Sequence, residues 1–339
     1  MASPKQQRID PKTVPAPKKK TPPPSKKSKS GRPGGRPPGA APIPKVTVGD
    51  WIGGARLQTL SLAIAPVAIG TAAAYVVAPE DAGPGWHWLR ALLCLAVAVF
   101  LQIGVNFAND YSDGVRGTDA YRVGPKRLTA SGAVKPRTVL VVALVFFGLA
   151  AVAGLIIVVR SGHWWLLAVG AVAILAAWFY TGGKRPYGYI GLGEVFVFIF
   201  FGLVATAGTT FVLEGDVTLE SWLGGVAIGL FACAVLMINN LRDREQDKLA
   251  GKRTLSVRIG DRASRIVYAV LTLLPFTILA FFSLLYDKAY LVFFALLIAI
   301  PAALIGLTGK TAPEFVLALR LTSLTALVFG LGLGWAIAF

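Results

Sequence analysis

Two stretches of the sequence carry acidic residues at a spacing that suits a metal ion. The first, Asn106 to Asp119, reads N-F-A-N-D-Y-S-D-G-V-R-G-T-D and directly follows an apolar segment. Asn109 and Asp113 are four residues apart, so they share one helix face. Asp110 stands beside Asn109, and Asp119 follows one short loop later. Such oxygen ligands suit Mg²⁺, which usually completes its shell with water and substrate phosphates.

A second stretch repeats the pattern and makes the first one meaningful. It reads N-N-L-R-D-R-E-Q-D and places Asn239, Asp243 and Asp247 at successive intervals of four, again after a long apolar run. Either cluster alone could be a polar helix end facing water. Acids at a membrane edge are costly to bury, so a matched pair favours function. We therefore expect each cluster to hold one Mg²⁺ ion over a shared diphosphate.

The composition is that of a protein that crosses a membrane many times. Of 339 residues, 55% are hydrophobic, and the mean hydropathy is +0.64, which excludes an ordinary soluble enzyme. The net charge of +17 is uneven, because 12 of the 34 Lys and Arg residues precede residue 46, against one acid, Asp10. We expect residues 1–45 to form a disordered basic cytoplasmic tail that is attracted to anionic lipid. The tail lacks the interleaved aromatic residues of nucleic-acid binding, so no nucleic-acid partner is expected.

Residues 46–339 are expected to form a single transmembrane domain. Nine apolar runs of sufficient length to cross the hydrocarbon layer, the fourth being short, lie at about 57–78, 88–110, 137–159, 164–181, 189–212, 221–241, 264–286, 289–308 and 315–338. The fold class predicted from them is an all-α integral membrane protein. It is a bundle of nine transmembrane helices around a central cavity open to the cytoplasmic side.

The charges of the loops orient this bundle. Loops after the second, fourth and sixth runs are rich in Lys and Arg, and the loop after the eighth carries Lys310, whereas the alternate loops carry mostly acids. Because cytoplasmic loops hold an excess of basic residues, we expect the N-terminus and both acid clusters to lie inside the cell, and the C-terminus outside. The location expected is the plasma membrane, with many passes.

Basic and aromatic residues near the acid clusters could complete a site for an isoprenyl diphosphate. The basic residues expected to bind its phosphate oxygens are Lys126, Lys184, Arg185, Lys252 and Arg253. The tyrosines that could stabilise an allylic cation with their ring faces are Tyr180, Tyr187 and Tyr111. Arg56, just before the first run, could serve a second substrate. Loop basic residues equally serve membrane orientation, and tyrosines at span ends equally form an aromatic belt.

These motifs resemble those of the UbiA-type superfamily of intramembrane aromatic prenyltransferases. Within it, the resemblance is closest to the menaquinone-pathway branch that acts on 1,4-dihydroxy-2-naphthoate, and it covers about residues 50–338. The pointers are N-D-Y-S-D-G-V-R-G-T-D, G-P-K-R-L-T-A-S-G-A-V at Gly124 to Val134, Y-T-G-G at Tyr180 to Gly183, and G-K-R-T-L-S-V-R-I-G ending at Gly260.

The resemblance implies Mg²⁺-dependent transfer of a polyprenyl group from polyprenyl diphosphate to dihydroxynaphthoate, with loss of CO₂, to give a demethylmenaquinone. Family metal roles carry over to Asn109, Asp113, Asp243 and Asp247. We expect Asp110, Asp119 and Asn239 to add ligands, and Asp113, Asp243 and Lys184 to act in catalysis. The sequence departs from many family members at Gly117, where they have an acid, and Asp119 could substitute for it.

Two alternative functions remain open from the sequence. The first is prenyl transfer to another acceptor, such as a hydroxybenzoate, homogentisate or a haem, because spacing does not define the acceptor pocket. The second is transport of a divalent cation through intramembrane acids. A transporter would place its acids near the middle of spans, whereas these acids gather at span ends beside Lys and Arg, which would repel the ion.

Overall fold

The computed structural model describes residues 46–78, 87–118 and 127–339. The expectations for residues 1–45, for Asp119 and for Lys126 therefore lie outside the described residues. Every regular element in the described part is helical, which confirms the all-α class. The elements are α1 (Val48–Ala55), η2 (Leu57–Thr59), α2 (Ser61–Val77), α3 (Trp88–Arg116), α4 (Pro136–Ser161), α5 (Leu166–Phe179), η3 (Tyr187–Ile190), α6 (Gly193–Val197), η4 (Phe198–Val204), α7 (Ala205–Glu214), α8 (Leu219–Arg242), α9 (Arg244–Leu249), α10 (Leu255–Leu273), α11 (Pro275–Leu285), η5 (Ala289–Ala295), α12 (Leu296–Thr308) and α13 (Ala312–Ala338).

Seven helices of the described part are long and apolar enough to cross a membrane, or eight if one bent pair counts as a single span. The bent pair is Val48–Thr59 with Ser61–Val77, and its two halves meet at 45°. Each of the nine apolar runs lies largely on helix, but the fourth forms only the 14-residue helix α5. At 1.5 Å per residue, α5 is roughly 21 Å long, shorter than the hydrocarbon layer. A count of nine spans thus stays a prediction.

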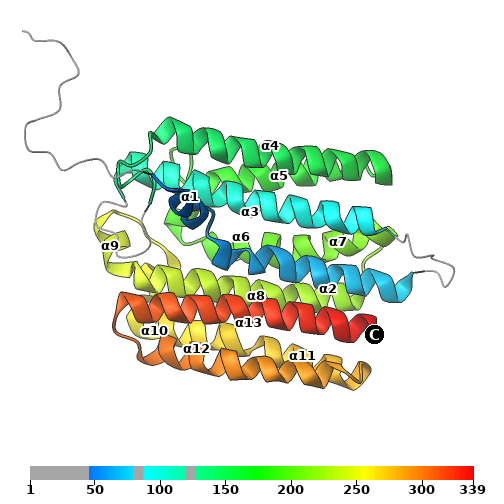
Figure 1. Ribbon diagram of the computed structural model, residues 1–339. Helices are drawn as coiled ribbons and strands as arrows, with labels where there is room; N and C mark the ends of the chain where they lie inside the picture. Colours follow the sequence, from blue (N-terminus) through cyan, green and yellow to red (C-terminus); the bar gives the residue numbers. More distant parts are fainter. Residues whose placement is uncertain (1–45, 79–86, 119–126) are drawn as a thin grey trace, which may run out of the picture. The chain divides into compact units, whose positions relative to one another are not determined.

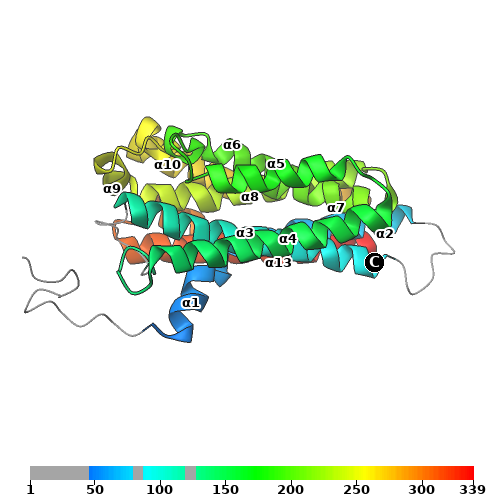
Figure 2. The ribbon, with the colours of Figure 1, turned by 90° about the horizontal axis from the view of Figure 1, so that it is seen from above.

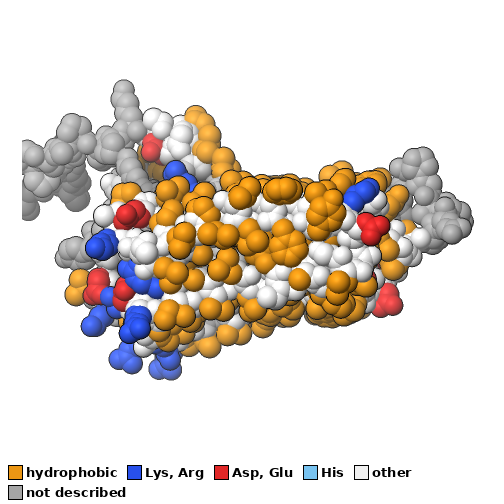
Figure 3. Space-filling model, turned by 90° about the horizontal axis from the view of Figure 1, so that it is seen from below, with side chains coloured by type: hydrophobic (Ala, Val, Ile, Leu, Met, Phe, Trp, Pro, Cys, Tyr) orange, Lys and Arg blue, Asp and Glu red, His pale blue; other side chains and the backbone are white. Residues whose placement is uncertain are grey.

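The helices lie side by side in an elongated bundle (Figures 1 and 2). Figure 1 shows the C-terminal end of α3, the short helix α9 and helix α1 at one end of the bundle, and the C-terminus of the chain at the other. Both acid motifs therefore lie at the same end. Figure 3 shows hydrophobic side chains along the length of one face and a concentration of Lys and Arg at one end. This distribution is typical of a bundle that lies in lipid.

Small residues allow the central helices to approach closely. A Cβ added to Gly330 of α13 would lie 2.4 Å from the Ala65 Cβ of α2. A Cβ added to Gly202 of η4 would lie 2.5 Å from the carbonyl oxygen of Gly225 on α8. Close backbone contact of this kind drives helix association in lipid, where apolar surface gains nothing by leaving water. It packs α2, α8, α13 and η4 together and leaves the cavity on the side of α3 and α5.

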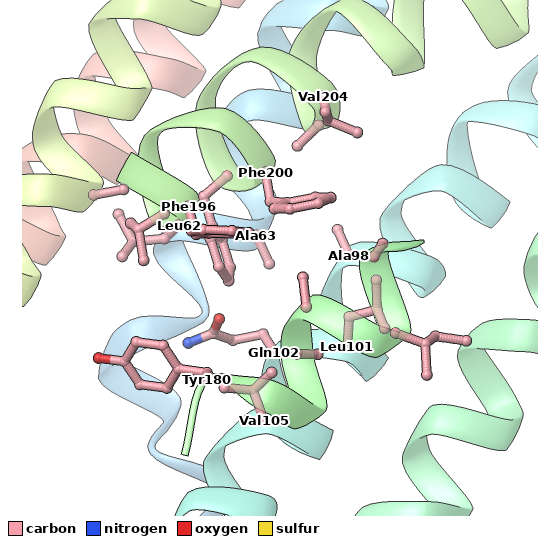
Figure 4. A pocket seen from close by; sticks show the side chains of 18 of the residues that line it. Leu62, Ala63, Ala98, Leu101, Gln102, Val105, Tyr180, Phe196, Phe200 and Val204 are labelled. Carbon is pink, nitrogen blue, oxygen red and sulfur yellow. The ribbon is translucent and has the colours of Figure 1, made fainter. Parts of the chain in front are cut away.

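The fifth apolar run contains a π-helical segment, η4, between α6 and α7. Wider turns of this kind are frequent at functional sites. Figure 4 shows Phe200 and Val204 of this segment, with Phe196 of α6, along the wall of the cavity. The segment thus contributes aromatic and apolar lining at the face that meets α5.

Candidate active site

Both acid motifs end in the same backbone turn. After α3, the N–H of Gly117 donates to the Gly114 carbonyl and the N–H of Thr118 donates to the Asp113 carbonyl. Gly117 adopts φ 72°, which an L side chain disfavours. This arrangement is a Schellman motif, in which glycine follows the last helical turn. Asp113 is therefore held in the final turn of α3, with its side chain lining the cavity.

The second motif repeats this turn after α9. The N–H of Gly251 donates to the Lys248 carbonyl, and the N–H of Lys252 donates to the Asp247 carbonyl, at 3.2 and 2.8 Å. Gly251 has φ 75°. Asp247 thus occupies the same place in its cap as Asp113 does in the other. The turn also brings the next residue, Lys252, back beside Asp247.

Lys252 joins the two motifs. Its Nζ lies 3.2 Å from Asp113 Oδ1 and 3.8 Å from Asp247 Oδ1. The lysine is 8% exposed, and the two acids are 4% and 9% exposed. Charged groups are buried at this level only when they are paired. Residues far apart in the sequence therefore form one charged cluster.

Asp113 has two further partners. Its Oδ1 accepts a 2.5 Å hydrogen bond from the Tyr189 hydroxyl, and its Oδ2 lies 3.8 Å from Arg127 Nη2. The Tyr189 ring also faces Lys252 Nζ at 4.7 Å and the Arg116 guanidinium at 5.4 Å. Burial, and then the negative charge of Asp113, raise the pKa of Tyr189. The phenol therefore keeps its proton and remains a hydrogen-bond donor to Asp113.

Asp243 lies at the junction of α8 and α9 and has a different partner. Its two carboxylate oxygens accept from Arg242 Nε and Nη2 at 2.7 and 2.6 Å. The same Nη2 donates to Asn239 Oδ1 at 2.9 Å. Two parallel bonds from a guanidinium fix the orientation of a carboxylate. Arg242 thus aligns two of the expected metal ligands.

The remaining polar residues of the first motif separate into two roles. Asn109 lines the cavity, and its Oδ1 accepts from the Thr181 hydroxyl at 2.8 Å. Asp110 is 1% exposed and is absent from the cavity wall. Its carboxylate accepts the backbone N–H groups of Leu128 and Thr129, each at 2.9 Å. Asp110 therefore anchors the loop that carries Arg127.

The cavity has a volume of about 570 Å³. Its polar end holds the charged cluster, and its other end is lined by apolar residues such as Val97, Val158 and Val212. Figure 4 shows Gln102 and Tyr180 within it, with Leu101, Phe196 and Phe200 further along. Tyr180 lines this cavity together with Tyr187.

The structure brings most of the predicted site residues together. Those that line the cavity are Arg56, Asn109, Asp113, Tyr180, Tyr187, Asn239, Asp243, Asp247 and Lys252. Lys184, Arg185 and Arg253 are exposed and absent from the cavity lining, and the half-buried Tyr111 is also absent from it. The backbone N–H of Arg253 donates to the Tyr189 carbonyl at 2.8 Å. Lys184 and Arg185 lie in the loop after α5, next to Thr181 and Gly183, whose carbonyls accept from Arg116.

Several residues in this site were not singled out from the sequence. They are Tyr189, Arg127, Arg242, Thr181 and Asn240. Arg127 stands next to the predicted Lys126 in one basic loop, and nothing in the sequence separates the two. Asn240 follows Asn239, and its Nδ2 donates to Glu194 Oε1 at 3.1 Å. Arg127 lies within the quoted stretch Gly124 to Val134, and Asn240 lies within the second acid motif, so position in these stretches was the available signal.

The donor set suits a hard divalent ion that arrives with a phosphate ligand. Among residues 46–78, 87–118 and 127–339, no group of three or more His, Cys, Asp or Glu side chains could hold a metal ion. Each cluster instead offers one or two carboxylates beside an Asn, with all five side chains lining one cavity. Mg²⁺ is usually bound through one or two carboxylates plus substrate phosphates. These residues therefore fit Mg²⁺ in the company of a diphosphate.

The fold, the cavity and the paired motifs define a membrane-embedded prenyltransferase. The chain belongs to the UbiA prenyltransferase family, whose model matches residues 64–324. It is 45% identical over 308 residues to the 1,4-dihydroxy-2-naphthoate octaprenyltransferase of Mycobacterium tuberculosis, which covers 86% of this chain and 97% of that relative. It is 38% identical over 240 residues to the protein of the same name from Escherichia coli, covering 69% of this chain and 76% of that relative. The expected family is confirmed.

Solved structures share the fold. A UbiA homolog from Archaeoglobus fulgidus bound to GPP and Mg²⁺ has a TM-score of 0.59 and 15% identity, and the match covers 85% of this chain and 99% of that one. A UbiA homolog from Aeropyrum pernix K1 has a TM-score of 0.60 and 17% identity, covering 82% and 96%. At these identities the likeness concerns the arrangement of helices.

Proposed function

We propose that this protein transfers a polyprenyl group from a polyprenyl diphosphate to 1,4-dihydroxy-2-naphthoate, releasing diphosphate and CO₂ and giving a demethylmenaquinol, which is the reduced form of demethylmenaquinone. The observation that carries the proposal is the junction of the two acid motifs on Lys252, 3.2 Å from Asp113 and 3.8 Å from Asp247, at the polar end of an otherwise apolar cavity. The names of the M. tuberculosis and E. coli relatives support this acceptor.

The polar end would bind the diphosphate. Asn109 and Asp113 on one side, and Asn239, Asp243 and Asp247 on the other, would hold two Mg²⁺ ions. Bound there, the ions would neutralise charge on the departing diphosphate. Lys252 and Arg127 are buried beside Asp113 and would donate charge-assisted hydrogen bonds to its oxygens. Those cations argue against an ion transporter, because they would repel its cargo.

The apolar end would hold the prenyl chain. Asp113 and Cys94 both line the cavity and lie 19 residues apart on α3, so the cavity follows the helix for roughly 28 Å. A chain bound along it leaves the C1 carbon next to the diphosphate. The ring of Tyr180 lines the cavity and would stabilise positive charge on C1 as the C–O bond breaks. Dry walls limit capture of the cation by water.

The acceptor would lie between the polar end and helices α2 and α3. Arg56, Thr59, Gln102 and Asn106 line the cavity there. Gln102 and Asn106 donate to the Thr59 hydroxyl at 2.8 and 3.3 Å, so both amides are held in place. The Arg56 guanidinium suits the acceptor carboxylate. The new C–C bond forms at the carbon that bears this carboxylate, and the electrons of the C–CO₂⁻ bond return to the ring as CO₂ leaves.

The same proposal includes the orientation in the plasma membrane. The N-terminus and the active site would face the cytoplasm and the C-terminus the outside, because the basic loops lie at the end that carries the acid motifs. Residues 1–45 would contact anionic lipid. Deleting residues 1–44 should leave kcat unchanged and lower the affinity for vesicles that contain anionic lipid. Loss of turnover by a folded truncation would contradict that role.

The function is tested with purified protein, 1,4-dihydroxy-2-naphthoate, a polyprenyl diphosphate and Mg²⁺, by measuring the mass of the product. We expect an adduct lacking the mass of CO₂. Parallel reactions with 4-hydroxybenzoate and homogentisate test the other acceptors. EDTA should stop turnover, and added Mg²⁺ should restore it. Activity that survives thorough chelation would refute the metal requirement, and a product only from hydroxybenzoate would refute the acceptor.

A further inference from the structure

The positive charge between the two acid motifs is a side chain of the protein, the ammonium of Lys252. Lys252 Nζ lies within salt-bridge distance of an acid from each motif, Asp113 and Asp247. Both of these acids are expected to bind the divalent ion. The Lys252 ammonium therefore neutralises the same two carboxylates that a bound divalent ion would neutralise. The question is what this lysine does when the ion binds.

The fold holds Lys252 in this place from several directions. The Schellman motif after α9 ties its backbone N–H to the Asp247 carbonyl at 2.8 Å. The Tyr189 ring faces its Nζ at 4.7 Å, and the Tyr189 hydroxyl donates to Asp113. The next residue, Arg253, is bonded through its backbone N–H to the Tyr189 carbonyl. The ammonium is thus positioned by two separate segments of the chain.

The carboxylates of the cluster can pair either with Lys252 or with a divalent ion. Carboxylates that share a buried ammonium offer less net negative charge to Mg²⁺, so the ion alone must compete with Lys252. A diphosphate changes this balance, because its oxygens provide a new anionic partner for the ammonium. Lys252 can then leave the carboxylates to the ion without losing its own charge compensation.

We propose that Lys252 is an internal counter-cation that joins the two acid motifs and competes with the divalent ion, so that the ion and the diphosphate bind together. Tyr189 is its positioning residue. This inference rests on the proposed metal-dependent function. It predicts that removing the ammonium strengthens binding of the ion alone, whereas a residue that only supports the metal site would weaken it on removal.

The test measures binding of Mn²⁺ alone, without diphosphate, by the loss of the free-ion electron paramagnetic resonance signal. Lys252→Met should bind Mn²⁺ on the order of tenfold more tightly than wild type. Lys252→Gln is a second neutral variant that keeps polar contacts with both acids. Lys252→Arg keeps the charge and should retain the wild-type affinity. Lys248→Met is the matched control, because this substitution removes the same charge at an exposed position on α9.

Equal or weaker Mn²⁺ binding by both Lys252→Met and Lys252→Gln would overturn the inference. So would an equal gain in Lys248→Met, because that would report net charge alone. Thermal unfolding supplies a further readout: both neutral variants should gain more in Tm from added Mn²⁺ than wild type does. The proposed function fails separately, since wild-type turnover that survives EDTA would refute the metal requirement, whatever the Mn²⁺ affinities are.

Discussion

The C-terminal end of α3 and the α8–α9 junction carry the same Asn-x-x-x-Asp spacing on different backbones. Asn109 and Asp113 lie on one continuous helix that ends at Arg116. Asn239 lies on α8, whereas Asp247 lies on α9 beyond a break at Asp243, where φ is −94° and ψ is 6°. The second motif therefore distributes its ligands over two helices. Equal spacing in sequence leads here to unequal geometry.

The residue that follows each Asn shows the same contrast. Asp110 follows Asn109 and accepts two backbone N–H groups from the loop at Leu128. Asn240 follows Asn239 and donates to the buried Glu194. Both side chains bond to a neighbouring segment, but Asn240 also lines the cavity, whereas Asp110 does not. The comparison teaches that the residues at the interval of four line the cavity in both motifs, while the residue after each Asn bonds to a neighbouring segment.

The largest expected effect tests whether the two motifs contribute equally. Asp113→Asn and Asp243→Asn should each lower kcat/KM by about a thousandfold or more, because each removes a charge that would hold the ion. Steady-state kinetics of variants that remain folded in detergent would measure this. Asp216→Asn, an exposed acid outside the motifs, is the control. Near-normal rates for one of the two variants would show that a single motif suffices.

A smaller effect is expected at the supporting position of the first motif. Asp110→Asn replaces one of the two acceptor oxygens with an NH₂ group, which cannot accept the backbone N–H of Leu128 or Thr129. We expect a loss of about 1–3 kcal/mol in the free energy of unfolding, seen as a lower Tm in detergent. Asp113→Asn should cost more activity than Asp110→Asn. A variant at Asp110 with normal Tm and lost metal binding would instead make this residue a ligand.

The smallest effect compares the two caps. Gly117→Ala and Gly251→Ala each force an L side chain into the left-handed region, at a cost of about 1–2 kcal/mol. No atom lies within 4 Å of either added Cβ, so the cost is conformational. Activity should fall further in Gly251→Ala, because that cap positions Lys252. Equal loss of activity in both, at equal loss of Tm, would assign the caps a purely structural role.

Much of this arrangement follows from local sequence patterns. Apolar runs predicted the helical class, because a helix satisfies its backbone hydrogen bonds within one run and each run is long enough to cross the lipid. The interval of four in each motif placed Asn109 with Asp113 on one helix face, and the structure has both lining the cavity. The family resemblance of the motifs is confirmed by the match over residues 64–324.

The tertiary structure alone decided which charged residues face one another. Of the predicted phosphate-binding residues, Lys252 is buried against both motifs, while Lys184, Arg185 and Arg253 are exposed. The sequence shows that each of these residues is charged but not which way its side chain points. The direction of the Lys252 side chain depends on the turn at Gly251 and on contact with Tyr189, which lies in a distant segment. Helical periodicity reaches a few residues along the chain, and the meeting of two helix ends depends on how the whole bundle packs.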